Sequence, residues 1–168
     1  AYTVPLAVAG VIGALTGVSF ASGGSAPPIV DRNPSTATAP SNAGNVLFIV
    51  VDTLRADHLP AYGYTEIETP NLDAFAADAI RFAQAFANAS WTRPSFASIL
   101  TGRLPSSHGV MAKPDALADE LVTMPEAFGN AGWETRGIAT NFNVAPYFNF
   151  HQGFDRYEYL EPNFVLGA

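Results

Sequence analysis

Thr92 has the residue type and the local setting of a hydroxyl nucleophile. Pro94 fixes its own φ and needs no amide donor, so the pattern predicts a short helix from about Pro94 to Thr101, stopped by Gly102. Thr92 would lie in the turn just before that helix, where outward-facing amides and the positive end of the helix dipole favour an anion. A hydroxyl that attacks a phosphate or sulfate ester suits this position.

Asp52 is placed to hold a metal ion that could activate such a hydroxyl. Residues 45–51 form a continuous apolar, β-branched-rich run, typical of a strand buried on both faces of a parallel sheet. Asp52 ends the run, and ligands of open α/β sheets gather outside the carboxyl ends of strands. A threonine hydroxyl is a weak nucleophile, and no Cys-His or Ser-His pairing is evident in the sequence around Thr92. We therefore expect metal activation, with Asp52 and Thr92 as ligands.

Three further residues are candidates for the same site. Arg93, next to the nucleophile, and Arg55 could each hold an anionic ester through a planar, bidentate fork. Residues 134–140 predict a second parallel strand that delivers Asn141 to the same sheet edge as Asp52. Asn141 would either line the site or cap the following turn, and the sequence leaves both open.

Other polar and aromatic residues near these positions have simpler explanations. Asp57 and His58 resemble a metal-binding pair, but polar pairs in surface loops are more often solvated, so they are secondary candidates. His108, beside a glycine, fits a structural hydrogen-bonding role better than that of a base. Trp91 and Phe96 are expected to pack rather than to contact substrate.

Helical and extended patterns alternate along the chain, which predicts an α/β fold. Thr69-Pro70 predicts the start of a second helix, because proline is favoured at the first helical position. Apolar and polar residues partly alternate over Ile80–Phe86, which is expected to be a strand or extended segment. Thr123–Glu126 has the spacing of a capping box, so a helix should begin there and end at one of the next two glycines. The tail, residues 142–164, is aromatic and rich in loop signals.

The first 44 residues have a different character. No charge occurs from Tyr2 to Pro28, and the apolar stretch approaches the roughly 20 residues that a membrane-spanning helix needs. Residues 1–22 therefore predict a transmembrane or signal-anchor segment, with a cleaved signal peptide or a buried helix as alternatives. Residues 23–44 are rich in Pro, Gly, Ser and Ala and read as a linker. With a transmembrane or signal-anchor segment at residues 1–22, residues 45–168 are expected to lie outside the cytoplasm.

Composition excludes some classes of function. The 168 residues carry a formal net charge of −7, which argues against nucleic-acid binding because cationic side chains must replace condensed counterions. The absence of cysteine excludes disulfides and Cys-ligated zinc within this sequence.

Four motifs, taken together, resemble the sulfatase family of the alkaline-phosphatase-like superfamily. They occur in the order seen in that family and are Val46–His58, Thr69–Asp73, Thr92–Arg103 and Gln152–Asp155. The resemblance covers roughly residues 45 to 160 and implies the N-terminal portion of an α/β domain with a mostly parallel sheet and helices on both faces. It also implies a bound divalent metal, calcium first and magnesium, manganese or zinc as alternatives. The remaining metal ligands of the family, an Asp followed by His or Asn, would lie beyond Ala168.

The chain departs from the family pattern at the nucleophile. Typical sulfatases carry Cys/Ser-x-Pro-Ser-Arg, whose first residue becomes formylglycine, whereas this chain has Thr92-Arg-Pro-Ser-Phe96. Threonine is not a known precursor of formylglycine, and members of the superfamily with an unmodified threonine include phosphodiesterases and membrane phosphoglycerol or phosphoethanolamine transferases. The paired aspartates of many sulfatases are reduced to Asp52-Thr53, and no Lys-x-His follows the second strand.

We therefore expect a metal-dependent, extracytoplasmic hydrolase of anionic sulfuric or phosphoric esters, with Thr92 as the metal-activated nucleophile. One alternative is a membrane phosphotransferase that works through phospho-threonine. The other is a catalytically silent sulfatase-like binding module, which the loss of the formylglycine precursor makes conceivable.

Overall fold

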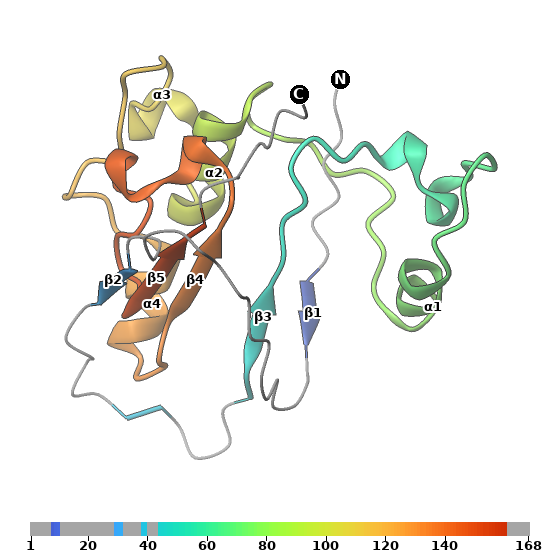
Figure 1. Cartoon of the computed structure of the whole chain (residues 1–168), viewed down its shortest axis with the longest axis horizontal. Coiled ribbons are helices and arrows are strands. Elements are labelled where there is room, and N and C mark those ends of the chain that lie inside the picture. Colours follow the sequence, from blue (N-terminus) through green and yellow to red (C-terminus); the bar gives the residue numbers. More distant parts are fainter. Residues whose placement is uncertain (1–7, 11–28, 32–37, 40–43, 161–168) are drawn as a thin grey trace, which may run out of the picture. The chain divides into compact units, whose positions relative to one another are not determined.

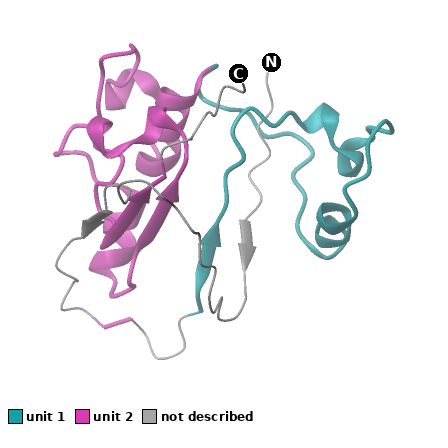
Figure 2. Ribbon diagram, viewed as in Figure 1, with its two compact units in different colours: residues 1–16, 44–90 teal, residues 17–43, 91–168 magenta. Residues whose placement is uncertain are grey.

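The computed structural model describes residues 8–10, 29–31, 38–39 and 44–160, and Figure 1 shows their elements. The chain divides into two compact units, which Figure 2 distinguishes by colour. Unit 1 contains Ala1–Thr16 and Gly44–Ser90, and unit 2 contains Gly17–Ala43 and Trp91–Ala168. Asp52 therefore belongs to unit 1, whereas Thr92 belongs to unit 2.

Unit 1 contains a two-stranded sheet followed by helical turns. β1 (Val8–Gly10) pairs antiparallel with β3 (Val46–Phe48). Two 3-10 turns follow, η1 (Ala56–His58) and η2 (Pro60–Tyr62), and then helix α1 (Pro70–Asp78). Proline begins both η2 and α1, where its missing amide costs nothing, so the helix start predicted at Thr69-Pro70 is confirmed.

The prediction of a buried parallel strand over residues 45–51 is wrong for the described structure. The strand is limited to Val46–Phe48, its partner runs antiparallel, and two of its three side chains are exposed; Val46 is 57% exposed, and Ile49, just beyond the strand, is 62% exposed. The physical reason is that pairing with β1 satisfies backbone groups along one edge of β3 but covers neither of its faces.

The rest of unit 1 is also largely exposed. Leu72 and Phe75 of α1 lie on the surface, as do Ile80, Phe82 and Phe86 in the segment that follows. Residues 80–86 were expected to be a strand or extended segment, and the structure assigns them no strand. Their partial alternation of apolar residues lacks a neighbouring strand among the described residues of unit 1 with which to pair.

The described residues of unit 2 contain three α-helices, α2 (Thr92–Thr101), α3 (Pro105–His108) and α4 (Met124–Asn130). α2 starts at Thr92, two residues before the predicted start at Pro94. Pro94 is tolerated as the third helical residue because the amides of the first turn have no intrahelical partner. The helix ends at Gly102, as predicted, and that residue has a left-handed conformation. The capping box that begins α4 is also confirmed: Thr123 N donates to Glu126 Oε2 at 2.8 Å, and Glu126 N donates to Thr123 Oγ1 at 3.3 Å.

A three-stranded sheet completes unit 2 in the order β2, β5, β4. β4 (Arg136–Ala139) and β5 (Arg156–Tyr159) are parallel, and β2 (Ile29–Asp31) runs antiparallel to β5. The turns η3 (Phe142–Val144) and η4 (Pro146–Phe148) lie between β4 and β5 in the chain. The unit is thus α/β, and the parallel strand predicted over residues 134–140 is confirmed.

The expectation that the strand over residues 134–140 shares a sheet edge with Asp52 is not met among the described strands. β4 belongs to the sheet of unit 2 and pairs with β5, which lies in the tail that was expected to be rich in loops, whereas β3 pairs with β1. The β5 sequence Arg-Tyr-Glu-Tyr alternates charged and aromatic residues, and the structure buries Tyr157 and Tyr159 on one face. Only the pairing of β4 with β5 is parallel among the described strands, so the expectation of a mostly parallel sheet is not met in this structure.

The hydrophobic core of unit 2 lies between α2 and the loops and turns that follow it. Ala97 and Val110 are fully buried, and Phe150 is 1% exposed. Ala139 of β4 packs against this cluster and against a smaller cluster of Ala145, Tyr157 and Tyr159, so β4 joins the two. The larger cluster consists of Ala97, Leu100, Val110, Leu117, Leu121, Val144, Phe148 and Phe150.

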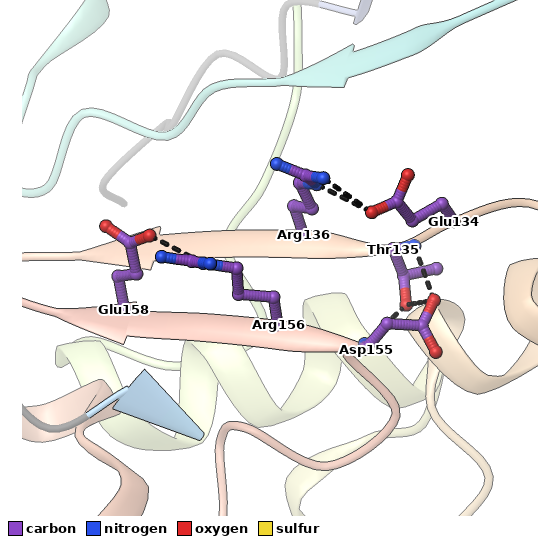
Figure 3. A network of polar contacts seen from close by, with 6 residues as sticks. All are labelled: Glu134, Thr135, Arg136, Asp155, Arg156 and Glu158. Carbon is purple, nitrogen blue, oxygen red and sulfur yellow. Dashed lines mark hydrogen bonds and ion pairs between the residues drawn. The ribbon is translucent and has the colours of Figure 1, made fainter. Parts of the chain in front are cut away.

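The Gln152–Asp155 motif holds α4, β4 and β5 together. Thr135 N donates to Asp155 Oδ2 at 2.8 Å, and Asp155 N donates to Thr135 Oγ1 at 2.9 Å; Figure 3 draws these contacts with the exposed Arg136–Glu134 pair and the half-buried Arg156–Glu158 pair. Gln152 Nε2 donates to Leu121 O at 2.6 Å. Gly153 has φ +87° and lies against the capping box of α4. The motif is therefore structural in this unit.

His108 forms a second structural contact, as its sequence setting suggested. Its Nδ1 accepts a hydrogen bond from Val110 N at 3.1 Å, so the neutral ring carries its proton on Nε2, which lies 3.0 Å from Ser98 Oγ. Burial lowers the pKa of His108 below its ordinary value. The neutral ring thus ties the end of α3 to α2.

The predicted N-terminal segment and linker fall mostly outside the described residues. Within residues 1–22, Val8–Gly10 forms β1, and within residues 23–44, Ile29–Asp31 forms β2. Across the ranges that the structure describes, no helix has the length and apolar character needed to cross a bilayer.

Gly153→Ala should destabilise unit 2 strongly. A Cβ at this position would lie 2.6 Å from both Glu126 N and Thr123 Oγ1 in a left-handed backbone conformation, so we expect a loss of about 3 kcal/mol in the free energy of unfolding. Gly109→Ala is the matched control, because Gly109 also has positive φ but has open space around it, and we expect a loss of about 1 kcal/mol. Urea denaturation measures both, and equal losses would contradict the close packing of Gly153.

The stability of unit 2 should fall in mild acid. The folded-state pKa values of His108 and His151 are both lowered by burial, so their contribution is complete above pH 6.5, the ordinary histidine value, and decreases as the pH falls through the folded pKa values. His108→Gln should reduce the slope of unfolding free energy against pH below 6.5, while His151 accounts for the remainder. Urea denaturation at several pH values measures the slope, and an unchanged slope would contradict the neutral state of His108.

Candidate functional site

Thr92 is the first residue of α2 and is half-buried. Trp91 occupies the N-cap in an extended conformation, φ −143° and ψ 163°, and makes no side-chain cap hydrogen bond. Helix amides of the first turn and the positive end of the dipole therefore are not satisfied by a capping side chain at this end. The sequence predicted Thr92 in the turn before the helix, whereas the structure makes it the first helical residue. It keeps the electrostatic setting that favours an anion.

Arg93 lies at the same helix end and is 3% exposed. Its Nη1 donates to the carbonyl oxygen of Lys113 and, at 3.3 Å, to that of Asp115, while Nη2 donates to Asn143 Oδ1 at 3.3 Å. The guanidinium carbon lies 3.3 Å from the centroid of the Phe148 ring. The expected role of Arg93 in holding an anionic ester is not supported by this geometry, because its guanidinium faces protein acceptors instead.

Asn141 caps a turn, one of the two roles left open by the sequence. It follows β4 directly, and its Oδ1 accepts hydrogen bonds from Asn143 N at 2.8 Å and Asn143 Nδ2 at 3.2 Å. Asn143 in turn accepts from Arg93, so the C-terminal end of β4 is linked to the first turn of α2. Sequence reasoning missed Asn143, although the Asn-x-Asn spacing directly after a strand was a usable signal.

Asp52 lies in unit 1, in the turn after β3, and is exposed. The next residue, Thr53, has φ +59°, a left-handed conformation that is rare for a β-branched residue. This backbone outlier fixes the course of the chain immediately after the carboxylate. The Asp52 side chain itself is exposed, as a residue that binds a metal ion from solution must be.

Arg55, the other residue expected to bind the ester, forms an ion pair nearby. Its Nε and Nη2 donate to the Asp57 carboxylate at 2.8 and 2.5 Å, and these hydrogen bonds lower the pKa of Asp57. One edge of the Arg55 fork is therefore directed at Asp57. Both side chains are more than half exposed, so the pair contributes little to stability and could exchange for another anion.

The structure places the five predicted site residues in two units. In unit 2, Arg93 and Asn141 are linked through Asn143, and Thr92 is the chain neighbour of Arg93; Asp52 and Arg55 lie close in sequence in unit 1. The convergence of Asp52 and Thr92 on one metal ion stays a prediction. Within the described part of the chain, no group of three or more His, Cys, Asp or Glu side chains is arranged to hold a metal ion.

Comparison with known proteins identifies the family. The family model described as "Sulfatase" matches residues 44–164. Human arylsulfatase A is 36% identical over 124 residues, which are 67% of this chain and 24% of that protein. A "Sulfatase" of Formosa agariphila is 34% identical over 128 residues, covering 70% of this chain and 25% of that protein. An N-acetylglucosamine-6-O-sulfatase of Bacteroides thetaiotaomicron is 29% identical over 116 residues, 69% of this chain and 20% of that protein.

The family match covers the segment that holds every predicted site residue, and no solved structure matches the chain. The chain spans about a quarter of the length of the curated relatives that it matches. None of the three relatives has a name that supports the phosphotransferase alternative. With a family model that matches most of its length, and with the four motifs in order, the chain belongs to the sulfatase family.

Proposed function

We propose that the protein carrying this chain hydrolyses sulfuric esters and that Thr92 is its nucleophile. The observation that supports this most is the place of Thr92 in the first turn of α2, together with the resemblance of Thr92–Phe96 to the nucleophile motif of the family. The relatives are named as sulfatases, including an arylsulfatase, which supports an anionic sulfate ester as the substrate. Thr92 takes the role that formylglycine has in typical members.

The reaction follows from the chemistry of the hydroxyl. Thr92 Oγ1 attacks sulfur, the bond between sulfur and the alcohol oxygen breaks, and the hydroxyl proton ends on the departing alcohol. A water molecule then attacks the sulfur of the threonine sulfate ester, which restores the hydroxyl and releases hydrogen sulfate. The first turn of α2 contributes its dipole and amides toward the anionic sulfuryl oxygens during both steps.

Asp52 has the donor chemistry of a ligand for a hard divalent cation. Carboxylate oxygens are the ligand type that calcium, magnesium and manganese prefer, and Asp52 is exposed at the end of its apolar run. A cation bound there, calcium by family resemblance, would supply charge stabilisation to the ester and lower the proton affinity of a nearby hydroxyl. Asp52 would be one member of a larger ligand set that includes Thr92 and residues of the family domain outside this sequence.

Export of this domain also remains a proposal. Its support is the uncharged, apolar character of residues 1–22 and the linker composition that follows. Attachment to a membrane through this segment is part of the same proposal.

Thr92→Ala in the full-length protein should abolish hydrolysis of a sulfate monoester, because no other group replaces the attacking oxygen. Thr92→Ser should retain part of the activity, since it keeps the hydroxyl. Thr101→Ala is the matched control: it removes a threonine hydroxyl from the other end of α2, where Oγ1 donates to Ala97 O at 2.6 Å. Steady-state assays with a sulfate monoester and a phosphate diester measure the effect. Near-normal turnover in Thr92→Ala would remove Thr92 from the mechanism, and a preference for the diester would reassign the substrate class.

Asp52→Asn should weaken the binding of calcium by the full-length protein, because the amide loses the charge that attracts the cation. Asp78→Asn, which changes an exposed carboxylate at the end of α1, should leave the affinity unchanged. Isothermal titration calorimetry with calcium measures both. An unchanged affinity in Asp52→Asn would exclude its ligand role.

A further inference from the structure

The side chain of Arg93 joins three segments of unit 2 that are distant in sequence. Two of its hydrogen bonds go to main-chain carbonyls of the loop at residues 113–115, and a third goes to Asn143 in η3. Its guanidinium stacks on Phe148 of η4, with the carbon 3.3 Å from the ring centroid, and lies 5.7 Å from the ring centroid of Trp91. A single buried cation thus links the start of α2 to the loop and to both turns.

The acceptors around Arg93 are themselves held in place. Asp115 Oδ2 accepts hydrogen bonds from Met111 N at 2.8 Å and Ala112 N at 2.6 Å, which closes the loop whose carbonyls receive the guanidinium. Asn143 is fixed by Asn141, directly after β4. Phe148 is 4% exposed and belongs to the main hydrophobic cluster. The contacts therefore connect Arg93 to the rigid part of the unit.

Because the charge of Arg93 is buried, its contacts favour arginine over lysine at this position. A guanidinium removed from water loses much of its hydration and requires acceptors in compensation, and burial lowers the pKa of Arg93. Its Nη groups donate to protein acceptors and its plane stacks on a ring, whereas Nε is buried without a hydrogen-bond partner among the described residues. A planar group with a fork of donors satisfies this site, and the point charge of a lysine would not.

We propose that Arg93 is a positioning residue that fixes Thr92 relative to the end of β4. Thr92 is adjacent in the chain and lies in the same first turn, so anchoring Arg93 restricts the backbone that carries the hydroxyl. The Asn141–Asn143–Arg93 series of hydrogen bonds transmits the position of β4 to that turn. The proposal rests on the proposed function in one respect only, that Thr92 is the reacting residue.

Kinetics of the full-length protein distinguish positioning from substrate binding. Arg93→Met and the milder Arg93→Lys should lower kcat for a sulfate monoester by about 100-fold and about 10-fold, because small misplacements of reacting groups are costly. KM and the inhibition constant of inorganic sulfate should stay within about twofold of the parent, since Arg93 does not touch the ester. Arg103→Met is the matched control, removing an exposed arginine just beyond the other end of α2, and should leave kcat unchanged. Weaker sulfate inhibition in both Arg93 variants would show direct binding and overturn the proposal.

A double-mutant cycle tests the route of the coupling. Asn143→Ala removes the acceptor of Arg93 Nη2, so it should lower kcat by a smaller factor than Arg93→Met does. The double variant should be scarcely worse than Arg93→Met alone, because both changes remove the same contact. Multiplicative losses would contradict a shared network.

A structural readout keeps the proposal testable whatever the enzyme's substrate. Methyl relaxation of Thr92, measured by NMR on the full-length protein, should show a lower order parameter in Arg93→Lys and Asn143→Ala than in the parent and in Arg103→Met. An unchanged order parameter in these variants would overturn the positioning role even if Arg93→Met fails to fold. By contrast, full activity in Thr92→Ala would refute the proposed nucleophile and leave the relaxation result to decide the role of Arg93.

Discussion

A guanidinium taken out of water has to be surrounded by acceptors, and much of unit 2 is arranged around that requirement. The loop that supplies carbonyls to Arg93 is closed by Asp115, the turn that supplies Asn143 is capped by Asn141, and the ring beneath the guanidinium belongs to the core. Each of these partners depends on local hydrogen bonds or packing that the others do not provide. The electrostatic setting of the first turn of α2 therefore depends on long-range structure as well as on the helix itself.

The Gln152–Asp155 motif has an equivalent role at the other end of the sheet. Gly153 allows close approach to the α4 capping box, and Asp155 receives the amide of Thr135 just before β4. The same short motif thus fixes where β4 begins, while Asn141 defines how the chain leaves its end. The family's motifs in this unit thus have different parts: the Thr92 motif carries the proposed nucleophile, and the Gln152–Asp155 motif holds the scaffold around β4.

Local rules predicted local features well. Helix α2 stops at Gly102, the capping box opens α4, proline begins α1, and β4 forms where the sequence indicated, because each depends on a few neighbouring residues. Strand pairing was not predictable in the same way, since β4 chooses β5 through contacts between distant segments. The partners of Arg93 were missed for the same reason: the residue type suggests an anion-binding fork, and only the fold shows that carbonyls and a phenyl ring occupy it. The shared metal site of Asp52 and Thr92 stays a prediction, because local patterns do not determine whether two distant segments meet.

The exposed β3 segment has a consequence for the behaviour of the polypeptide in solution. Val46–Val51 is uninterrupted by charge or proline and has the composition of segments that stack into intermolecular cross-β assemblies. In the described structure, β3 belongs to a two-stranded sheet with one partner, β1, and its Val46 and Leu47 side chains are exposed. Solubility of any polypeptide limited to these residues would therefore be set by how quickly this hexapeptide is sequestered, and expression boundaries chosen to shield it would favour monomers over aggregates.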